Sequence, residues 1–392
     1  MAAAILGFTL VAIFSGVVNG VELTRTLSAT ILWTEPLLVA YVIWVALVRS
    51  ADPRKLGRSG TYLFVVVILA EVLMMTLQIP RQMSLPGGDW MQGTFLGSGT
   101  GAHVAPAVAF LGIVLVLESA TLDPRRRWLK LLFCAYGLLI TSLALARAVT
   151  AIYAVALILG TIIVGSRRSA KRWSAVAISL LIGIGFWLAF PLLGNVPDVE
   201  RQLPGWEVKV SGIKSIIEDM QSNPSYAVAG QGPGTTLSRV AMQTPEANLN
   251  LASPVASLGL GTTEFTRKIV HTRSGVDIAQ SSLFSPSSTL VGVLGDLGVV
   301  GLVMYVAMWL PLLRTTMEVS RGRGRYGVPV IVIATVVLGS LQIWLEEPGY
   351  VLSVALLLAL VAGNGFYPAF LVKGGEREDP SGRRHRWRVP GG

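Results

Sequence analysis

Runs of apolar residues that are long enough to cross a lipid bilayer restrict this chain more than any other feature. A membrane-spanning helix needs about 20 mostly apolar residues, and several runs in the sequence approach that length. The chain is 52% hydrophobic and only 14% charged, whereas about 25% of the residues in soluble domains are charged. We therefore expect an all-α polytopic membrane protein. The apolar runs predict ten transmembrane helices, at about residues 3–19, 27–48, 61–79, 103–117, 128–146, 148–165, 173–190, 289–313, 327–345 and 350–372.

The positions of the basic residues predict how the chain is oriented. A net charge of +10 raises the question of nucleic-acid binding, but the basic residues lie in short connectors and in the tail and form no basic face. Of the 32 Lys and Arg residues, 22 fall in the tail and in the connectors on one side of the predicted bundle. The positive-inside rule then places both termini in the cytoplasm. We expect a multi-pass protein of the inner or plasma membrane that binds no nucleic acid.

A long polar segment at 191–286 separates the seventh and eighth predicted spans, and the same rule places it outside the cytoplasm. The tail mixes Gly, Pro, Arg and Glu, a composition typical of disordered segments. Its basic residues either touch anionic lipid or belong to a solvated tail that enforces the topology. The chain therefore divides into four parts: transmembrane helices one to seven at 1–190, one large extracytoplasmic loop at 191–286, transmembrane helices eight to ten at 287–372, and a basic cytoplasmic tail at 373–392.

The large loop contains one stretch with helical periodicity. Its apolar residues recur three or four positions apart, while charged residues occupy the other faces. This pattern predicts an amphipathic helix that either lies on the outer membrane surface or packs against the core of the loop itself. The residues of the apolar stripe are Trp206, Val210, Ile213, Ile217 and Met220.

Arg147 is the most informative charge in the sequence. It interrupts an almost continuous apolar stretch at 128–165, and a charge at that depth costs a few kcal/mol and often marks a functional site. A turn residue that snorkels to the headgroups is the alternative. A guanidinium suits phosphate, because it donates hydrogen bonds to two oxygens at once. Glu35 and Glu71 also lie inside predicted spans, as counter-ions to a buried arginine or as plain helix contacts.

Two features of the large loop are candidates for chemistry. His271 supplies the only imidazole of the loop, which makes it the natural general base, with a surface histidine as the alternative. Gly230, Gly232 and Gly234 form a Gly-Gln-Gly-Pro-Gly turn that does not match a dinucleotide fingerprint. Such a turn either brings backbone N–H groups close to an anion or is structural. The single Cys134 excludes an intramolecular disulfide, and no cluster of metal ligands is evident, so we expect no metal and no cofactor.

Taken in order, four segments of this sequence resemble the O-antigen ligase and O-antigen polymerase (Wzy-type) membrane family. The resemblance covers roughly residues 60–315, and the large loop falls where that family has it. The resembling segments are Gly93-Thr94-Phe95, the apolar helix Leu139-Ile140-Thr141-Ser142 that ends at Arg147, the pairing of Trp206 with Gly230-Gln231-Gly232-Pro233-Gly234, and the re-entry helix Leu294-Gly295-Asp296-Leu297-Gly298-Val299-Val300-Gly301-Leu302. One departure stands out, because a His-Asn pair that commonly precedes the acidic residue in the family is replaced by Ser287-Ser288.

The resemblance implies a GT-C-like helical fold and a metal-independent transfer reaction. A glycan would pass from a polyprenyl pyrophosphate carrier to a hydroxyl of an acceptor glycan or lipid, in contact with membrane lipid and with other polysaccharide assembly proteins. Fixed cations can stabilise the pyrophosphate leaving group. In this scheme Arg147, Arg201 and Arg273 bind the pyrophosphate, while His271 or Asp296 accepts the proton of the acceptor hydroxyl. Polymerase and ligase share these features and are not separated by them.

Three other functions stay open at the level of sequence. A peptidoglycan polymerase of the shape and division type also has ten spans and a large loop after the seventh, and its acidic loop residue would be Asp219 here. A transporter or flippase could line its path with Glu35, Glu71 and Arg147, although no matched pair of broken helices is evident. A non-catalytic scaffold of a polysaccharide assembly complex is consistent with the missing His-Asn pair.

Overall fold

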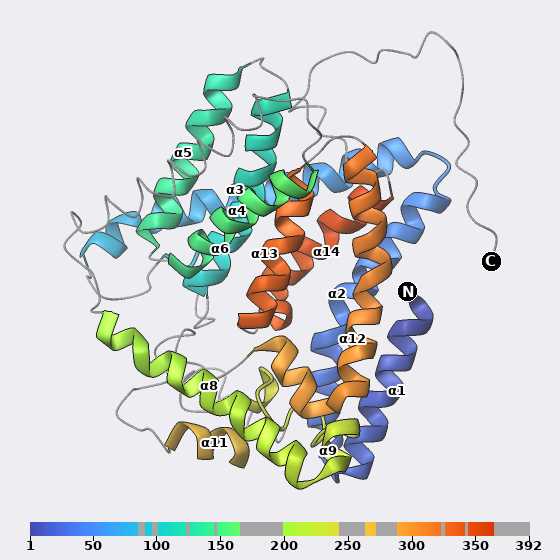
Figure 1. Cartoon of the computed structure of the whole chain (residues 1–392). Helices are drawn as coiled ribbons and strands as arrows, with labels where there is room; N and C mark the ends of the chain where they lie inside the picture. Colours follow the sequence, from blue (N-terminus) through green and yellow to red (C-terminus); the bar gives the residue numbers. More distant parts are fainter. Residues whose placement is uncertain are drawn as a thin grey trace.

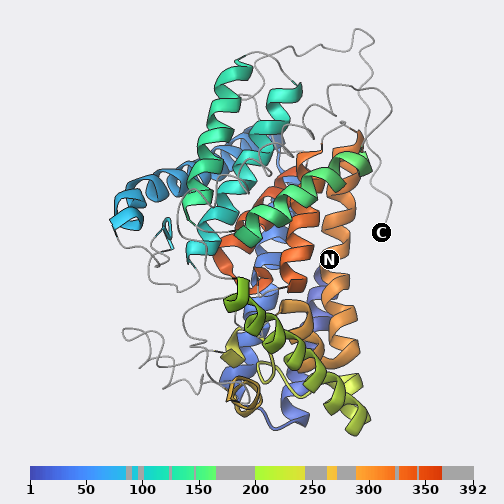
Figure 2. The same ribbon diagram turned by 60° about the vertical axis from the view of Figure 1, so that its left-hand side comes forward.

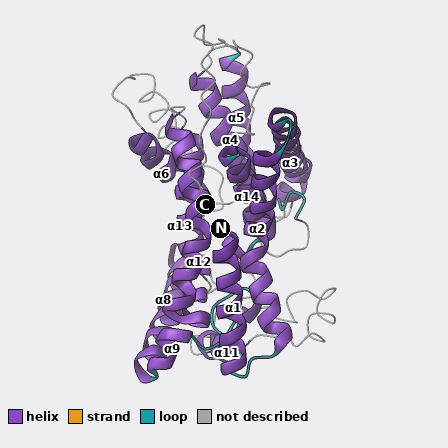
Figure 3. Ribbon diagram, turned by 90° about the vertical axis from the view of Figure 1, so that its right-hand side faces the viewer, coloured by secondary structure: helices purple, strands orange, loops and turns teal. Residues whose placement is uncertain are grey.

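The computed structural model describes residues 1–84, 91–95, 101–122, 126–144, 147–164, 199–242, 263–271, 288–322, 326–341 and 344–363. Within these ranges every regular element is a helix (Figure 3). The predicted all-α class is therefore confirmed for the described part of the chain. The predicted seventh span and the tail at 373–392 lie outside the described residues.

Three helices are long and apolar enough to cross a membrane. They are α2 (Leu23–Arg49), α3 (Pro53–Ser84) and α12 (Thr289–Gly322). Shorter helices coincide with most of the other predicted spans, and several of these are strongly apolar. The protein is thus a candidate multi-pass membrane protein. The shorter helices are α1 (Ala2–Val18), α4 (Gly101–Leu122), α5 (Arg127–Leu143), α6 (Arg147–Val164), α13 (Gly327–Leu341) and α14 (Pro348–Ala362).

The helices form one bundle in which elements distant in sequence lie side by side (Figure 1). Helices α1 and α2 form a hairpin, α1 packs on α12, and α14 packs on α2. Helix α13 packs on α6, and α4 packs on α5. Buried aromatic rings join the layers, since Phe8 of α1 lies 5.8 Å from Trp33 of α2 and 5.7 Å from Tyr305 of α12 between ring centroids. The first and last thirds of the chain therefore share one core.

The distribution of side chains on the long helices suits a lipid environment. Large apolar side chains such as Phe14, Val42 and Val303 are exposed along α1, α2 and α12, and exposed apolar surface on this scale marks contact with a membrane or a partner. The buried face of α2 carries hydroxyls instead. Thr30 and Thr34 donate hydrogen bonds to backbone carbonyls one turn earlier in the helix, which satisfies them without water.

Four elements from the predicted large loop gather at one end of the bundle (Figure 1, Figure 2). They are α8 (Val199–Ser222), α9 (Pro224–Ala229), η2 (Val240–Met242) and α11 (Glu264–His271). They meet the last turn of α1, the first turns of α2 and α12, and η4 (Trp344–Glu346). We call this end of the bundle the loop end. The described part of the loop is therefore a layer that packs against the membrane helices.

The helix predicted in the large loop is present as α8, and one of its faces is buried. Ile216 packs with Leu237 and Ile269 in a small core of the loop. Within the predicted apolar stripe, Val210 and Ile217 are exposed by 60% and 46%. Met220 of the predicted stripe packs against this core, so the loop core uses one residue of the stripe together with Ile216 beside it. The exposed stripe is the arrangement expected of a helix that rests on a membrane surface.

Candidate functional site

The glycine-rich turn at 230–234 wraps around the start of α12. The N–H of Gln231 donates to the carbonyl of Gly295 over 3.0 Å, and the N–H of Gly232 donates to the carbonyl of Asp296 over 2.8 Å. All three glycines of the turn have positive φ angles, namely 72°, 107° and 73°. Residues with side chains rarely adopt this conformation. The spacing of the three glycines is therefore explained by the path of the backbone around α12.

Close approach adds a second requirement at Gly230. A Cβ atom on this residue would lie 2.3 Å from the carbonyl oxygen of Asp296, which no real contact allows. On the other side of the contact, Gly298 has a φ of 65° and interrupts the helical geometry of α12. A Cβ there would lie 2.4 Å from the carbonyl oxygen of Val228. The turn and α12 thus touch backbone to backbone, which only glycine permits.

Asp296 is fully buried at the centre of this contact. Its Oδ2 accepts a hydrogen bond of 2.6 Å from the N–H of Gly234. Its Oδ1 accepts two more from Thr236, 2.7 Å from the backbone N–H and 2.6 Å from the hydroxyl. Both carboxylate oxygens are therefore held by the turn. A buried carboxylate that is satisfied in this way fixes the turn to α12, as backbone nests fix anions.

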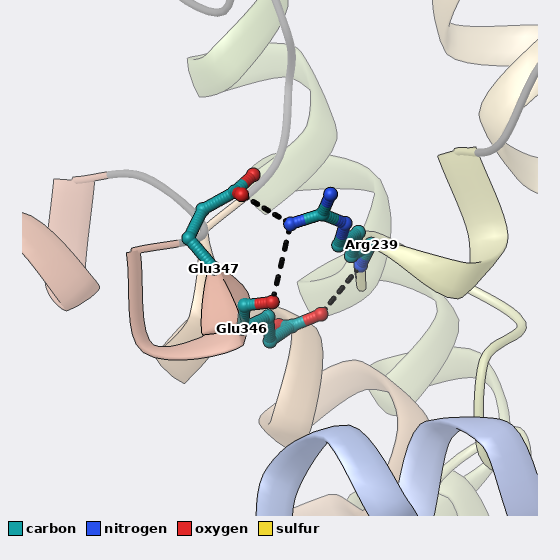
Figure 4. Close-up of polar contacts among 3 residues, drawn as sticks. All are labelled: Arg239, Glu346 and Glu347. Carbon is teal, nitrogen blue, oxygen red and sulfur yellow. Dashed lines mark hydrogen bonds and ion pairs between the residues drawn. The ribbon is translucent and has the colours of Figure 1, made fainter. Parts of the chain in front are cut away.

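Beside this anchor, Arg239 connects the loop to η4 and to the start of α14 (Figure 4). Its backbone N–H donates to Glu346 Oε2 over 2.6 Å. Its Nη1 forms an ion pair with Glu347 and donates to the carbonyl of Glu346 over 3.3 Å. The side chains of Arg239 and Glu347 are exposed by 25% and 7%. One arginine of the loop therefore covers two buried acids of the bundle.

Glu346 is only 1% exposed, and its carboxylate lies among groups from several elements. Burial raises its pKa to about 8. The backbone N–H of Arg239 and the indole of Trp33 oppose this rise, the carboxylate of Asp296 adds to it, and the Arg239 guanidinium opposes it further. Within the described residues, Glu346 Oε1 and Glu347 Oε1 have no hydrogen-bond partner. These acids thus differ from Asp296, since each keeps one oxygen unpartnered.

The end of α13 provides a further attachment for the loop. Lys209 of α8 donates from Nζ to the carbonyl of Leu341 over 3.0 Å, and burial lowers its pKa to about 8. Ser288, in the predicted serine pair, donates from Oγ to the carbonyl of Ser340 over 2.6 Å. Both donors meet carbonyls at a helix C-terminus, where donors and cations are favoured. Ser288 therefore serves the start of α12 and the end of α13 as a structural contact.

The other predicted site residues are placed only in part. Arg147 is the first residue of α6, Arg201 lies in the first turns of α8, and His271 is the last residue of α11. Their side chains, and Arg273 as a whole, lie outside the described residues. The structure therefore brings together Asp296 and the three glycines of the turn, and the roles predicted for the three arginines and the histidine stay predictions.

Two other acids that the sequence singled out are bound to neighbouring backbone or side chains. Glu71 of α3 is buried and accepts hydrogen bonds from the backbone N–H and the hydroxyl of Thr94, so it holds the segment 91–95 rather than a buried arginine. Asp219 accepts a hydrogen bond of 2.7 Å from the side chain of Gln231. Within the described ranges, no group of three His, Cys, Asp or Glu side chains is placed to hold a metal ion.

Sequence reasoning missed Arg239, Glu346 and Glu347 as a unit. The two glutamates stand before Pro348-Gly349, which is the pattern of a solvated turn between helices. Their partner lies more than 100 residues earlier in the chain. The one signal that could have indicated them is a pair of acids directly after an apolar span.

The chain was also compared with known proteins. No protein-family model matches it, and no curated protein matches it.

Proposed function

We propose that this protein is a multi-pass membrane transferase of the O-antigen ligase and polymerase type. It has ten spans in a GT-C-like arrangement, with both termini in the cytoplasm and the loop end on the outer face of the membrane. It moves a glycan from a polyprenyl pyrophosphate carrier to an acceptor hydroxyl. Arg147, Arg201 and Arg273 bind the pyrophosphate.

One observation carries the proposal: the loop seals a group of buried acids at one end of an apolar bundle and covers them with a cation. A donor whose lipid tail lies in the bilayer presents its pyrophosphate at this depth. Asp296, Glu346 and Glu347 come from the bundle, and Arg239 comes from the loop. Polar chemistry is thereby concentrated where a lipid-linked substrate would react.

Arg239 adds a cation to the three arginines named from the sequence. Its Nη1 makes both of its side-chain contacts with the acids. Within the described residues its Nε and Nη2 form no hydrogen bond or ion pair, and a quarter of the side chain is exposed. A guanidinium that is held on one edge by a carboxylate presents its other edge to phosphate oxygens in a fixed orientation. Arg239 therefore supports pyrophosphate binding at the loop end.

The test is glycan profiling of cells that lack the protein, complemented with wild type or with single variants. Arg147→Ala and Arg239→Ala are expected to restore less than a tenth of the surface polysaccharide that wild type restores. Arg314→Ala is the matched control, because Arg314 pairs with Glu318 on an exposed face of α12, far from the loop end. All three variants must reach the membrane in equal amounts, as judged by immunoblot.

An unchanged surface glycan in the deletion strain would contradict the transferase function and favour transport. Deleting residues 199–242 separates these functions further, because translocation of a lipid-linked glycan could survive the loss of the loop whereas transfer could not. Full activity of His271→Ala would show that the histidine takes no part in the reaction, and it would not contradict the transferase function.

A further inference from the structure

A transferase of the proposed kind needs a base for the acceptor hydroxyl. Two acids of the loop end, Asp296 and Glu346, have carboxylates that differ in how many hydrogen bonds they accept. Asp296 uses both carboxylate oxygens to hold the turn at 230–234. Removing a proton from a substrate would require it to exchange these bonds. The backbone N–H of Arg239 donates to Oε2 of Glu346. The indole of Trp33 lies close enough to oppose the rise in the pKa of Glu346, but within the described residues neither its N–H nor Glu346 Oε1 forms a hydrogen bond.

The surroundings of Glu346 come from four elements and suit a polar ligand. The indole of Trp33 in α2 lies near its carboxylate, and Asp296 and the hydroxyl of Tyr305 in α12 lie within electrostatic range. Glu347 and Arg239 complete the charged groups that face it. Tyr305 Oη and Glu347 Oε1 are likewise buried and unpartnered within the described ranges. Hydroxyl, indole and carboxylate groups of this kind bind sugar hydroxyls by both donating and accepting.

We propose that Glu346 is the general base of the transfer reaction and that the polar cluster of Trp33, Tyr305, Arg239, Glu346 and Glu347 is the subsite for the acceptor sugar. This inference rests on the proposed function. It replaces His271 and Asp296 as the proton acceptor with a residue whose free oxygen and fixed orientation are visible in the structure.

The proton and electron balance of the step is simple. Glu346 acts in its ionised form, whose fraction grows as the pH approaches its raised pKa of about 8. The acceptor O–H bond breaks and its proton moves to Oε1 of this carboxylate. The acceptor oxygen forms a bond to the anomeric carbon of the donor glycan, and the bond from that carbon to the pyrophosphate oxygen breaks. The electron pair of the broken bond stays on the polyprenyl pyrophosphate, which the arginines stabilise. The proton leaves Glu346 for water after the product departs.

Arg239 controls access to this base. It is the one member of the cluster with substantial exposure, whereas Glu346 and Trp33 are each 1% exposed. Phosphate oxygens of a donor compete with Glu347 for the guanidinium, and a shift of this long side chain uncovers the acids beneath it. Binding of the donor thereby opens the acceptor subsite, so the donor binds before the acceptor.

The experiment compares wild type with Glu346→Gln, Glu346→Asp and the control Glu318→Gln, all purified in nanodiscs. The probe is the polyprenyl-pyrophosphate-linked glycan extracted from the deletion strain, with the acceptor fraction of the same cells. We expect Glu346→Gln to lower kcat by about 10²–10⁴-fold with the KM for the donor changed by less than about twofold. Glu346→Asp, which keeps a carboxylate, is expected to regain at least tenfold over Glu346→Gln with a displaced pH–rate profile.

The outcomes separate the two proposals. Active wild type together with Glu346→Gln at more than a tenth of its turnover overturns the base and leaves the transferase standing. Wild type that makes no product from the extracted donor overturns both. If Glu346→Gln does not fold, as judged by size-exclusion chromatography, Glu346→Asp decides the matter: a folded Asp variant with an unshifted pH–rate profile contradicts the assignment.

Discussion

The two acid sites at the loop end lie close together and are built in opposite ways. Around Asp296 every carboxylate oxygen is occupied, and the donors come from one short turn of the loop. Around Glu346 and Glu347 one oxygen of each carboxylate is unpartnered within the described residues, although both side chains are buried. At the first site the carboxylate holds two segments of the chain together. At the second, each carboxylate keeps one oxygen that a ligand could use.

The number of hydrogen bonds to each carboxylate separates acids that hold the fold from acids that are available to a ligand. A buried polar group that finds all its partners stabilises the fold, whereas an unsatisfied one costs about 1–3 kcal/mol. Such a cost persists where function requires it. By this criterion Glu71, held by Thr94, belongs with Asp296 and not with Glu346.

The largest expected effect is the loss of the Asp296 anchor. Asp296→Asn would turn an amide NH₂ toward the N–H donors of the turn or leave one of them unpaired. We expect a loss of about 2–4 kcal/mol in the free energy of unfolding, measured as a fall in Tm by intrinsic fluorescence in detergent. Glu346→Gln at pH 7 is the comparison. An Asp296→Asn variant that melts within about 2 °C of wild type, less than a loss of about 2 kcal/mol would give, contradicts the distinction between the two sites.

A smaller effect is expected from Gly230→Ala, with Gly20→Ala as its matched control. Both glycines have positive φ angles, 72° and 64°, which strain a residue with a side chain by about 1 kcal/mol. Gly230 also has a ψ of −174°, and this combination of angles is essentially restricted to glycine. Only Gly230 also faces a clash, because nothing lies within 4 Å of a Cβ on Gly20. We expect Gly230→Ala to cost about 1–3 kcal/mol more than Gly20→Ala in unfolding experiments. Equal costs would show that the turn can move away from α12.

A pH-dependent effect distinguishes Glu346 from Asp296. The pKa of Glu346 is raised to about 8 from its ordinary value of 4.5. Its contribution to stability is therefore complete below pH 4.5 and is lost as the pH rises through 8. Glu346→Gln has no proton to lose at this position. We therefore expect the Tm of the variant to rise relative to the Tm of wild type as the pH increases from about 5 to about 9. A difference in Tm that stays constant over this range would mean that Glu346 is not neutral in the folded protein at low pH.

The smallest effect is expected at the far end of the bundle. Arg314 and Glu318 form an exposed pair one turn apart, with side chains exposed by 77% and 63%. Such pairs contribute about 0.5 kcal/mol or less. Arg314→Ala should therefore leave Tm almost unchanged, and a large fall would show that this face is covered by something outside the described chain.

The sequence predicts the long helices because the residues that mark them are close together along the chain, whereas it did not predict the short elements α9, η2, α11 and η4. Apolar length alone predicts α2, α3 and α12, and helical spacing predicts α8. Local backbone geometry is also readable, since three glycines at alternate positions indicated an unusual turn. What these patterns share is that the responsible residues lie within a few turns of one another.

The pairing of distant residues could not be predicted in the same way. Ten Lys and Arg residues lie on the predicted outer side, and nothing in the spacing distinguishes Arg239 from the rest. Its partners follow α13, and their position beside the loop depends on how α13 and α14 pack. The face of α8 that is buried was likewise set by Leu237 and Ile269, which lie elsewhere in the loop.

The attachment of the loop to the end of α13 also fixes an order of events during synthesis. Lys209 and Arg239 emerge from the ribosome long before Leu341, Glu346 and Glu347. Domains fold as their segments are made, at about 5–20 residues per second, so the loop spends several seconds without these partners. Until then Lys209 lacks its bond to Leu341, and Arg239 lacks its bonds to Glu346 and Glu347. The last helices of the chain thereby complete a layer whose other members were made before them, and a chain stopped before Trp344 would lack the partners that hold the loop against the bundle.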